Sequence, residues 1–153
     1  YLAHKGASPF IILDGKRWYN TGDLGYLNEE GYLTISGRLK RFAKIGAEMI
    51  SLGAIEDCLL ESAEENDWSF PEESPPLAVC ALENENERTQ LILVSKENLP
   101  LQDINSTLKR KGFSNLSRIS EVFILDEIPI TGTGKTHYRQ LQDLLNKRQI
   151  ECK

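Results

Sequence analysis

The chain has 153 residues, of which 40% are hydrophobic and 27% are charged, and its formal net charge is -5. This composition is typical of one ordinary globular domain, or of one small domain with an appendage. Because the neutralisation of phosphates needs a basic surface, the net negative charge disfavours a general role in nucleic-acid binding.

The cysteines and histidines argue against a disulfide framework and against a zinc site. Cys58, Cys80 and Cys152 stand far apart and form no CxxC pair, so we expect a reducing, cytoplasmic environment. His4 and His137 cannot supply a zinc-ligand spacing, and the carboxylates do not follow the spacing of a calcium loop. We therefore predict no metal site within the chain.

The apolar runs and the first residues predict a soluble fragment. No apolar run approaches the roughly 20 residues of a membrane helix. The sequence begins Tyr1-Leu-Ala-His-Lys-Gly, without an initiator Met or the apolar core of a signal peptide. We expect a piece of a longer protein whose membrane contacts, where it makes them, lie outside this chain.

Short antiparallel hairpins are predicted over the first 38 residues. Asp14-Gly15 is a hairpin signal, and Asn28-Glu-Glu30 indicates a second turn. Gly37-Arg38 breaks the strand pattern. The expected strands cover residues 9–13, 17–19, 24–27 and 31–35.

From Leu39 onward we expect a compact α+β domain with a mixed sheet of about three strands and about three helices. Apolar residues recur at helical spacing, with Ser51 and Thr136 as N-caps and Gly112 as a helix stop. The expected strands cover residues 40–45, 77–82, 90–95 and 119–125, and the expected helices cover 51–66, 100–111 and 136 onward.

The first of three candidate motifs is Tyr19-Asn-Thr-Gly-Asp-Leu24. Its Gly permits a tight bend, and the carboxylate of Asp23 offers paired acceptors that suit two neighbouring hydroxyls, as on a ribose. The alternative is a turn in which Asp23 bonds its own backbone. The residues alone leave both interpretations open.

The second motif runs from Gly37 to Ala47 and alternates cations with apolar residues. A Gly-Arg step followed by such cations could hold a phosphate or a nucleotide. It could equally form an edge strand that its charges protect from pairing.

The third motif is Pro129-Ile-Thr-Gly-Thr-Gly-Lys-Thr136. It is similar to the end of a P-loop, but Pro129 stands where the first Gly belongs, so that pattern fails. Two glycines predict a mobile loop that presents Lys135 just before a helix, where a compact cation can approach a phosphate or a carboxylate. The alternative is a surface loop with a solvated lysine.

In this order and spacing the three motifs resemble those of the adenylate-forming superfamily, which contains acyl-CoA synthetases, carrier-protein ligases, luciferases and peptide-synthetase adenylation domains. Residues 19–24 match its Tyr-x-Thr-Gly-Asp motif, and residues 37–40 match its Gly-Arg-x-Asp/Lys hinge. Residues 129–135 match its Pro-x-Thr-x-x-Gly-Lys motif. The resemblance covers nearly the whole chain.

This resemblance implies an ATP-dependent enzyme that joins a carboxylate to AMP and then passes the acyl group to a thiol. Residues 1–38 would be the last strands of a large adenylation domain, and residues 39–153 would be its mobile C-terminal domain. Mg²⁺ would be bound through ATP and the large domain.

The motif residues receive roles from the same match. Asp23 would hold the ribose hydroxyls of ATP, and Arg38 would help bind the nucleotide. Lys40 would be the hinge residue of the domain rotation. Lys135 would stabilise charge as the adenylate forms, and Lys44 would serve the thioester step.

The loop that would line the path of the thiol departs from the family pattern. Ala47 stands where the family usually has Gly, with Gly46 just before it. Either the loop is shifted by one residue or a methyl group is tolerated beside the thiol. Met49 replaces a common Arg or Lys, so contacts made by that cation cannot be carried over.

Within the family, residues 42–52, 112–116 and 126–135 resemble acyl-acyl-carrier-protein synthetases, which in bacteria often form the C-terminal half of a bifunctional enzyme that reacylates 2-acylglycerophosphoethanolamine. This branch implies a fatty acid and acyl carrier protein as partners, and a cytoplasmic location that includes the inner face of the membrane. Coenzyme A is the alternative acceptor, as in an acyl-CoA or aryl-CoA ligase. A non-catalytic module that docks a carrier protein is the alternative of another class. A local basic patch for such docking would comprise Lys109, Arg110, Lys111 and Arg118.

Overall fold

The computed structural model describes residues 9–70, 75–83 and 88–151. The chain divides into two compact units, Tyr1–Arg41 and Phe42–Lys153, which are described one at a time. Cys152 and His4 lie outside the described residues.

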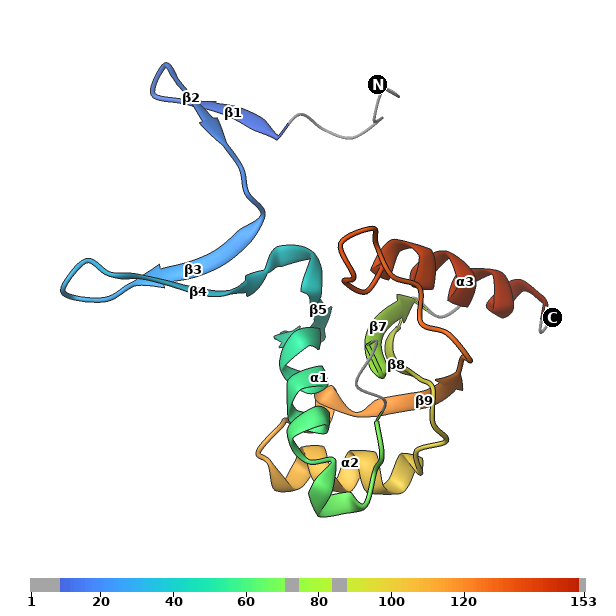
Figure 1. Cartoon of the computed structure of the whole chain (residues 1–153). Helices are drawn as coiled ribbons and strands as arrows, with labels where there is room; N and C mark the ends of the chain where they lie inside the picture. Colours follow the sequence, from blue (N-terminus) through green and yellow to red (C-terminus); the bar gives the residue numbers. More distant parts are fainter. Residues whose placement is uncertain (1–8, 71–74, 84–87, 152–153) are drawn as a thin grey trace. The chain divides into compact units, whose positions relative to one another are not determined.

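The first unit consists of two antiparallel hairpins (Figure 1), as predicted. In the first hairpin, β1 (Phe10–Leu13) pairs with β2 (Lys16–Tyr19). Asp14 and Gly15 both have positive φ, 51° and 72°, which a two-residue type I′ turn requires. The second hairpin joins β3 (Asp23–Leu27) to β4 (Leu33–Arg38). The expected break at Gly37-Arg38 is wrong, because β4 continues through both residues and pairs with Asp23 and Leu24.

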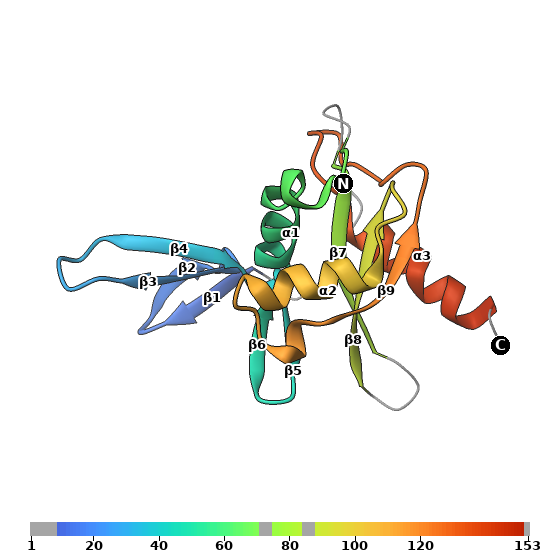
Figure 2. The ribbon, with the colours of Figure 1, turned by 90° about the horizontal axis from the view of Figure 1, so that it is seen from below.

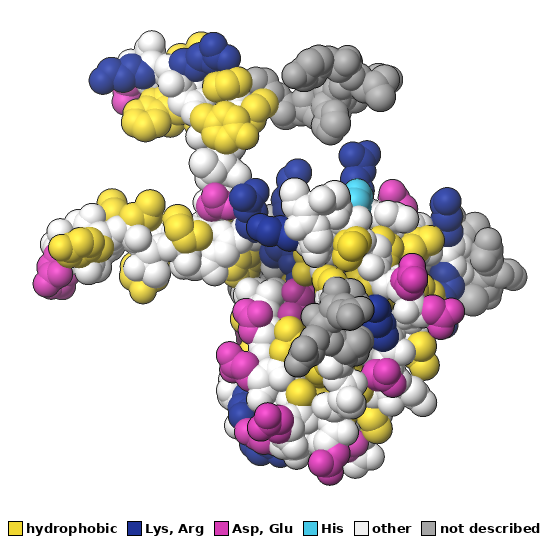
Figure 3. Space-filling view, viewed as in Figure 1, with side chains coloured by type: hydrophobic (Ala, Val, Ile, Leu, Met, Phe, Trp, Pro, Cys, Tyr) yellow, Lys and Arg dark blue, Asp and Glu magenta, His cyan; other side chains and the backbone are white. Residues whose placement is uncertain are grey.

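The hairpins do not bury their apolar side chains within themselves. A two-stranded hairpin has no second layer against which to pack. Figure 3 shows hydrophobic side chains over the surface of both hairpins. The side chains that are more than half exposed are Ile12, Leu13, Trp18, Tyr19, Tyr26, Leu27, Tyr32, Leu33 and Ile35.

The second unit begins with a hairpin that the sequence analysis predicted only in part. The chain forms a 3-10 turn, η1 (Leu39–Arg41), before β5 (Phe42–Ile45), so the expected charged strand starts later than predicted. The partner strand β6 (Glu48–Ser51) was not predicted. Only Ile50 of its four residues is buried. One buried apolar residue in four is too short a pattern to predict a strand.

The first helix is shorter than predicted. Ser51 caps α1 (Leu52–Glu61), as expected, since its Oγ accepts the N–H of Ala54 at 3.2 Å. The expected helix to residue 66 is wrong: a separate 3-10 turn, η2 (Glu64–Asn66), ends at Asp67, whose φ is 55°. This left-handed residue redirects the chain, and Trp68 and Phe70 pack against the core.

A three-stranded mixed sheet forms the centre of the second unit, as predicted (Figure 2). Its strands are β7 (Leu77–Glu83), β8 (Thr89–Ser95) and β9 (Ile119–Ile124), in the order β7-β8-β9. The pair β7–β8 is antiparallel and the pair β8–β9 is parallel. The remaining helices are α2 (Leu101–Arg110), a short 3-10 turn η3 (Asn115–Ser117), and α3 (Tyr138–Glu151).

Alternate residues of the strands enter two different cores. Val79 and Leu93 face α1 and α2, whereas Ala78 and Val94 face α3. Because both faces of the sheet are covered, β7 and β8 are continuous apolar runs. The fold is therefore a three-layered α+β unit with α1 and α2 on one face and α3 on the other.

The predicted end of α2 is correct, and the predicted N-cap of α3 is wrong. Gly112, with a φ of 90°, follows the end of α2 as expected. Thr136 does not cap α3, because it is held in a β-bridge with Ile130. His137 takes that role: its Nδ1 accepts the N–H of Gln140 at 3.1 Å. Within the described residues no helix is both long and apolar enough to cross a membrane.

Candidate functional site

Asp23 and Arg38, which come from two different motifs, meet at the base of the β3–β4 hairpin. They are cross-strand neighbours, and Arg38 Nε lies 2.7 Å from Asp23 Oδ1. The side chain of Asp23 is 26% exposed and that of Arg38 is 70% exposed. The pair therefore presents a carboxylate and an exposed cation at one place on the first unit.

The turn before Asp23 is built by other side chains. Asn20 Oδ1 accepts the N–H of Gly22 at 2.9 Å, and Thr21 Oγ1 accepts the N–H of Asp23 at 3.1 Å. Gly22 has a φ of 74° and its carbonyl accepts the N–H of Leu39. The carboxylate of Asp23 is thus directed at Arg38, while Asn20 and Thr21 shape the loop.

Lys40 lies in η1, two residues before the second unit begins at Phe42. The chain passes from one compact unit to the other at this point. The hinge role of Lys40 stays a prediction.

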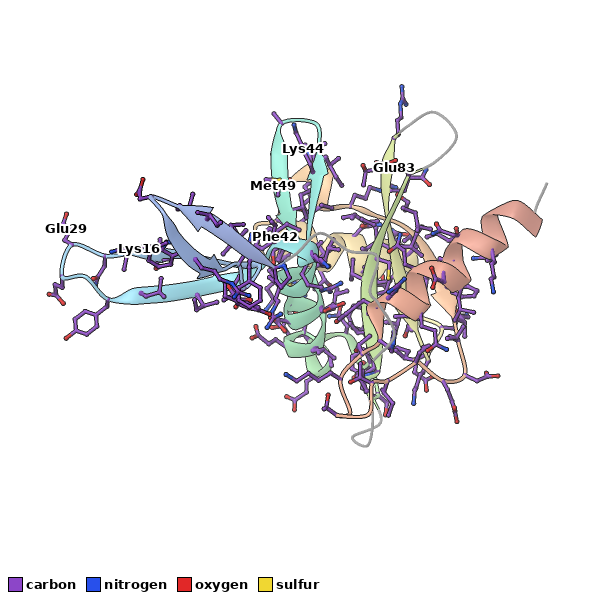
Figure 4. All side chains as sticks on the ribbon, turned by 90° about the horizontal axis from the view of Figure 1, so that it is seen from above. Lys16, Glu29, Phe42, Lys44, Met49 and Glu83 are labelled. Atoms are coloured by element: carbon purple, nitrogen blue, oxygen red, sulfur yellow. The ribbon has the colours of Figure 1, made fainter. Side chains whose placement is uncertain are left out.

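Lys44 projects outward from the middle of the β5–β6 hairpin. It is exposed and stands opposite Met49, which is also exposed; Figure 4 labels both. The alternate residues Ala43 and Ile50 are buried in the first core, which fixes the orientation of the hairpin. The carbonyl of Lys44 accepts the hydroxyl of Thr89, which ties the hairpin to β8.

The turn of this hairpin explains how Ala47 is accommodated. Ile45 pairs with Glu48, so Gly46 and Ala47 are the two central residues. Gly46 has a φ of 60°, whereas Ala47 is not among the residues with positive φ. A turn with positive φ only at its first central position is of type II′, which needs Gly at that position alone. The side chain of Ala47 therefore causes no backbone strain.

Lys135 lies in a closed loop, residues 129–137, which we call the lysine loop. The N–H of His137 donates to the carbonyl of Pro129 at 2.7 Å, and that of Thr131 donates to the carbonyl of Lys135 at 2.7 Å. Thr131 Oγ1 also accepts the N–H of Lys135 at 3.3 Å. These bonds make a small hairpin of the motif that was expected to be a mobile loop.

The ammonium group of Lys135 is available to a ligand. The residue is exposed, and within the described parts of the chain its side chain has no hydrogen-bond or ion-pair partner. A cation held on an ordered backbone, with its charge unpaired, is suited to an anionic group. Lys135 and Lys44 belong to the second unit, and Asp23 and Arg38 belong to the first.

The predicted basic patch is divided by an acidic neighbour. Arg110 and Lys111 both bind Glu65, at 3.0 and 2.8 Å. The hydrogen bond and the charge of Lys111 hold the pKa of Glu65 below its ordinary value. Lys109 and Arg118 instead line a pocket of about 760 Å³ between α2 and η3. Two of the four cations are thus neutralised locally.

No metal centre is found in the part of the chain that the structure describes. Across residues 9–70, 75–83 and 88–151, no cluster of three or more His, Cys, Asp or Glu side chains could hold an ion. Cys58 and Cys80 are buried, reduced cysteines. Burial raises the pKa of the Cys58 thiol, which keeps it protonated and unreactive.

One structural feature near the lysine loop was missed in the sequence. Glu56 of α1 is buried, and its Oε2 accepts the hydroxyl of Tyr138, the first residue of α3, at 2.9 Å. Glu56 stands four residues after Leu52 and three before Leu59, both buried. An acid at an inward position of an apolar helix face is a signal that could have found it.

Comparisons with known proteins identify what this arrangement is similar to. No family model matches the chain. Enterobactin synthase component E from Escherichia coli K12 is 29% identical over 140 residues, which are 88% of this chain and 24% of the relative. The medium-chain fatty-acid–CoA ligase of the same organism is 30% identical over 128 residues, 80% of this chain and 21% of the relative.

A solved structure with the same fold is that of O-succinylbenzoate coenzyme A synthetase from Bacillus subtilis, in complex with ATP and magnesium ion. It superposes with a TM-score of 0.62 at 25% identity, over 86% of this chain and 25% of that chain. The chain is therefore similar, in sequence and in fold, to the C-terminal domains of adenylate-forming ligases. The chain spans about a quarter of the length of the proteins named here.

Proposed function

We propose that this chain is the C-terminal part of an ATP-dependent ligase that activates a carboxylic acid as an acyl adenylate and passes the acyl group to a thiol. The observation that carries the proposal is Lys135, an unpaired, exposed cation on a hydrogen-bonded loop. The loop lies within the 96% of the chain that aligns with a protein named 2-succinylbenzoate–CoA ligase.

In the adenylation step, a carboxylate oxygen of the acid bonds to the α-phosphorus of ATP and pyrophosphate leaves. Charge gathers on the oxygens around the phosphorus, and the ammonium of Lys135 would stabilise it. Removing one well-aimed donor of this kind costs roughly 10²–10³ in rate. Mg²⁺ would supply further neutralisation of the phosphates, held by ATP and by the larger part of the enzyme.

ATP fits the residues of the first unit. The carboxylate of Asp23 can accept hydrogen bonds from both ribose hydroxyls, and Arg38 is exposed enough to turn toward a phosphate. The ion pair between them would hold the two side chains ready before the nucleotide arrives. Asp23 and Arg38 would thus bind the nucleotide, without a part in bond making.

The second step would follow a rotation of the second unit about Lys40. Lys44 and the turn Gly46-Ala47 would then face the adenylate, and the attacking thiol would displace AMP. The type II′ turn supports this proposal, because it leaves Ala47 unstrained beside the path of the thiol.

For the substrates, we propose a fatty acid, with acyl carrier protein as the acceptor. The likeness of residues 42–52, 112–116 and 126–135 to acyl-carrier-protein synthetases supports the carrier protein. The relative that is named a medium-chain fatty-acid–CoA ligase supports coenzyme A equally as the alternative. Assaying the full-length protein with both acceptors, each against decanoate, palmitate and benzoate, separates these candidates.

Lys135→Ala in the full-length enzyme tests the proposed activity. We expect ATP–pyrophosphate exchange to fall by roughly 10²–10³, since the transition-state charge loses its cation. Lys147→Ala, which removes an exposed lysine of α3, is the matched control and should exchange at the wild-type rate. Exchange at the wild-type rate in Lys135→Ala would refute the role of Lys135. No exchange in the wild type with any acid would favour the non-catalytic docking module.

A further inference from the structure

A buried carboxylate joins three elements of the second unit beside the lysine loop. Glu56 of α1 is 8% exposed. Its Oε1 accepts the N–H of Val79 at 2.6 Å, and its Oε2 accepts the hydroxyl of Tyr138 at 2.9 Å. The two oxygens of one side chain thus connect α1, β7 and the first residue of α3.

The position of Val79 explains why the carboxylate is tolerated. β7 is the edge strand of the sheet in the order β7-β8-β9, so some of its N–H groups point away from β8. The N–H of Val79 is satisfied by Glu56. A buried acid with hydrogen bonds to both oxygens is stable where an unpaired one would not be.

The lysine loop is closed by internal bonds, which set its shape but not its place on the core. That place is set by the residues on either side. Ile128, immediately before the loop, is buried in the core between the sheet and α3. Tyr138, immediately after it, packs against the same core and binds Glu56.

We propose that Glu56 and Tyr138 are positioning residues for Lys135. Their hydrogen bond fixes the start of α3, and with it the end of the lysine loop, so that the ammonium of Lys135 stays aimed at the phosphate during adenylation. The inference rests on the proposed function of Lys135. It adds two residues that touch no substrate and lie outside the three motifs.

The expected effect follows from how strongly catalysis depends on placement. A displacement of about 1 Å at a reacting group can cost about 10²-fold in rate. Tyr138→Phe keeps the packing of the ring and removes only the hydroxyl, which leaves one oxygen of Glu56 without this donor. We expect kcat for adenylation to fall by about tenfold, which is less than the loss of about 10²-fold for a displacement of about 1 Å.

The test measures the two half-reactions of the full-length enzyme separately. The acid used is whichever of decanoate, palmitate and benzoate supports the fastest ATP–pyrophosphate exchange. Tyr138→Phe should slow ATP–pyrophosphate exchange through kcat, with the KM for ATP unchanged. Acyl transfer from the supplied acyl-AMP to the acceptor should continue at the wild-type rate, since Lys135 serves only the first step. Glu56→Gln, which can still bind both partners, should retain most of the exchange activity, whereas Glu56→Ala should not.

Thr107→Val is the matched structural control. It removes a buried hydroxyl that donates to Asn66 Oδ1 at 3.1 Å in the same unit, away from the lysine loop. It should lower the unfolding temperature but leave the exchange rate unchanged. Equal losses of exchange in Thr107→Val and Tyr138→Phe would mean that the hydroxyl only stabilises the fold, and would overturn the proposal.

Amide hydrogen exchange provides a readout that does not depend on activity. In Tyr138→Phe the amides of Thr131, Gly134, Lys135 and His137 should exchange faster, while those of Ile104 and Leu108 in α2 should not change. Unchanged protection of the lysine loop would overturn the proposal whatever the enzyme's activity. If the wild-type enzyme forms no adenylate but Tyr138→Phe still speeds amide hydrogen exchange in the lysine loop, the positioning contact is upheld. The proposed function is then refuted instead.

Discussion

The two units of the chain differ in where their apolar side chains lie. In the second unit, α1 and α2 cover one face of the sheet and α3 covers the other, so residues such as Leu59, Leu93 and Leu141 are fully buried. In the first unit, Leu33 and Tyr32 are more than half exposed. The second unit carries its own core, whereas the hairpins need another surface to bury theirs.

This difference fits the proposal that the second unit is a mobile domain and that the hairpins belong to a larger domain. A mobile domain must remain folded while its contacts change, so it needs a complete core. Strands that belong to a larger domain need only complete the core of that domain. We therefore expect substitutions of similar chemistry to have different consequences in the two units.

The largest contrast should come from truncating a leucine in each unit. Leu59→Ala removes a fully buried side chain from the first core and should lower the free energy of unfolding of the second unit by about 2–5 kcal/mol. Leu33→Ala, in the exposed β4 strand, should change that free energy by less than about 0.5 kcal/mol. Denaturant titration of this chain measures both. A similar loss in the two variants would contradict the contrast.

A smaller contrast concerns the turns. Gly46→Ala should destabilise the second unit by about 1–2 kcal/mol, because its φ of 60° disfavours a side chain. An added Cβ would meet only Leu116 Cδ1, at an ordinary 3.8 Å, so the cost comes from the backbone. Gly15→Ala, with a similar φ in the first unit, should not move this transition.

Gly53→Ala provides the control of opposite sign. Gly53 lies inside α1 with open space around it and without positive φ. The substitution should stabilise the second unit by about 0.5–1 kcal/mol, since Ala favours the helix. Destabilisation by Gly53→Ala, or stabilisation by Gly46→Ala, would show that the assigned backbone conformations are wrong.

The smallest effect concerns pH and Glu65. Its pKa is lowered in the folded chain, chiefly by the hydrogen bond from Lys111, so the folded state holds its proton less tightly than the unfolded state. The stabilisation is therefore present above the ordinary Glu pKa and is lost as the pH falls through the folded pKa. The advantage of the wild type over Glu65→Gln should shrink with acidification over that range, as unfolding midpoints measured across pH would reveal.

A matched control for this pH effect lies in the first unit. Glu29→Gln, in the β3–β4 turn labelled in Figure 4, should leave the midpoint of the second unit unchanged at each pH. A Glu65→Gln difference that does not vary with pH would show that the carboxylate of Glu65 has no electrostatic effect on folding.

Most of the architecture could be predicted because its pattern is local. The apolar runs of β7 and β8, the helical spacing in α2 and the Asp14-Gly15 turn each express a preference within a few residues. The errors occur where a distant contact decides. Thr136 is a good N-cap by type, but its bridge to Ile130 moves that role to His137.

The candidate site was predictable as separate motifs and not as geometry. The register of β3 and β4 brings Asp23 next to Arg38. This register includes a shift between Leu24 and Gly25, which no local sequence pattern predicts. The bond between Glu56 and Tyr138 joins residues 82 positions apart, so it depends on how α1 and α3 pack around β7. Side-chain chemistry suggested which residues matter, and tertiary packing determined what holds them.

The most direct test of the proposed ligase measures both half-reactions in Lys135→Ala and Lys40→Pro of the full-length protein. Lys135→Ala should lose adenylate formation and keep acyl transfer from supplied acyl-AMP. Lys40→Pro, whose fixed φ restricts the rotation, should keep adenylate formation and lose the transfer. Opposite patterns in the two variants would support the separation of adenylation and rotation between these lysines. Loss of the same half-reaction in both, or of neither, would contradict it.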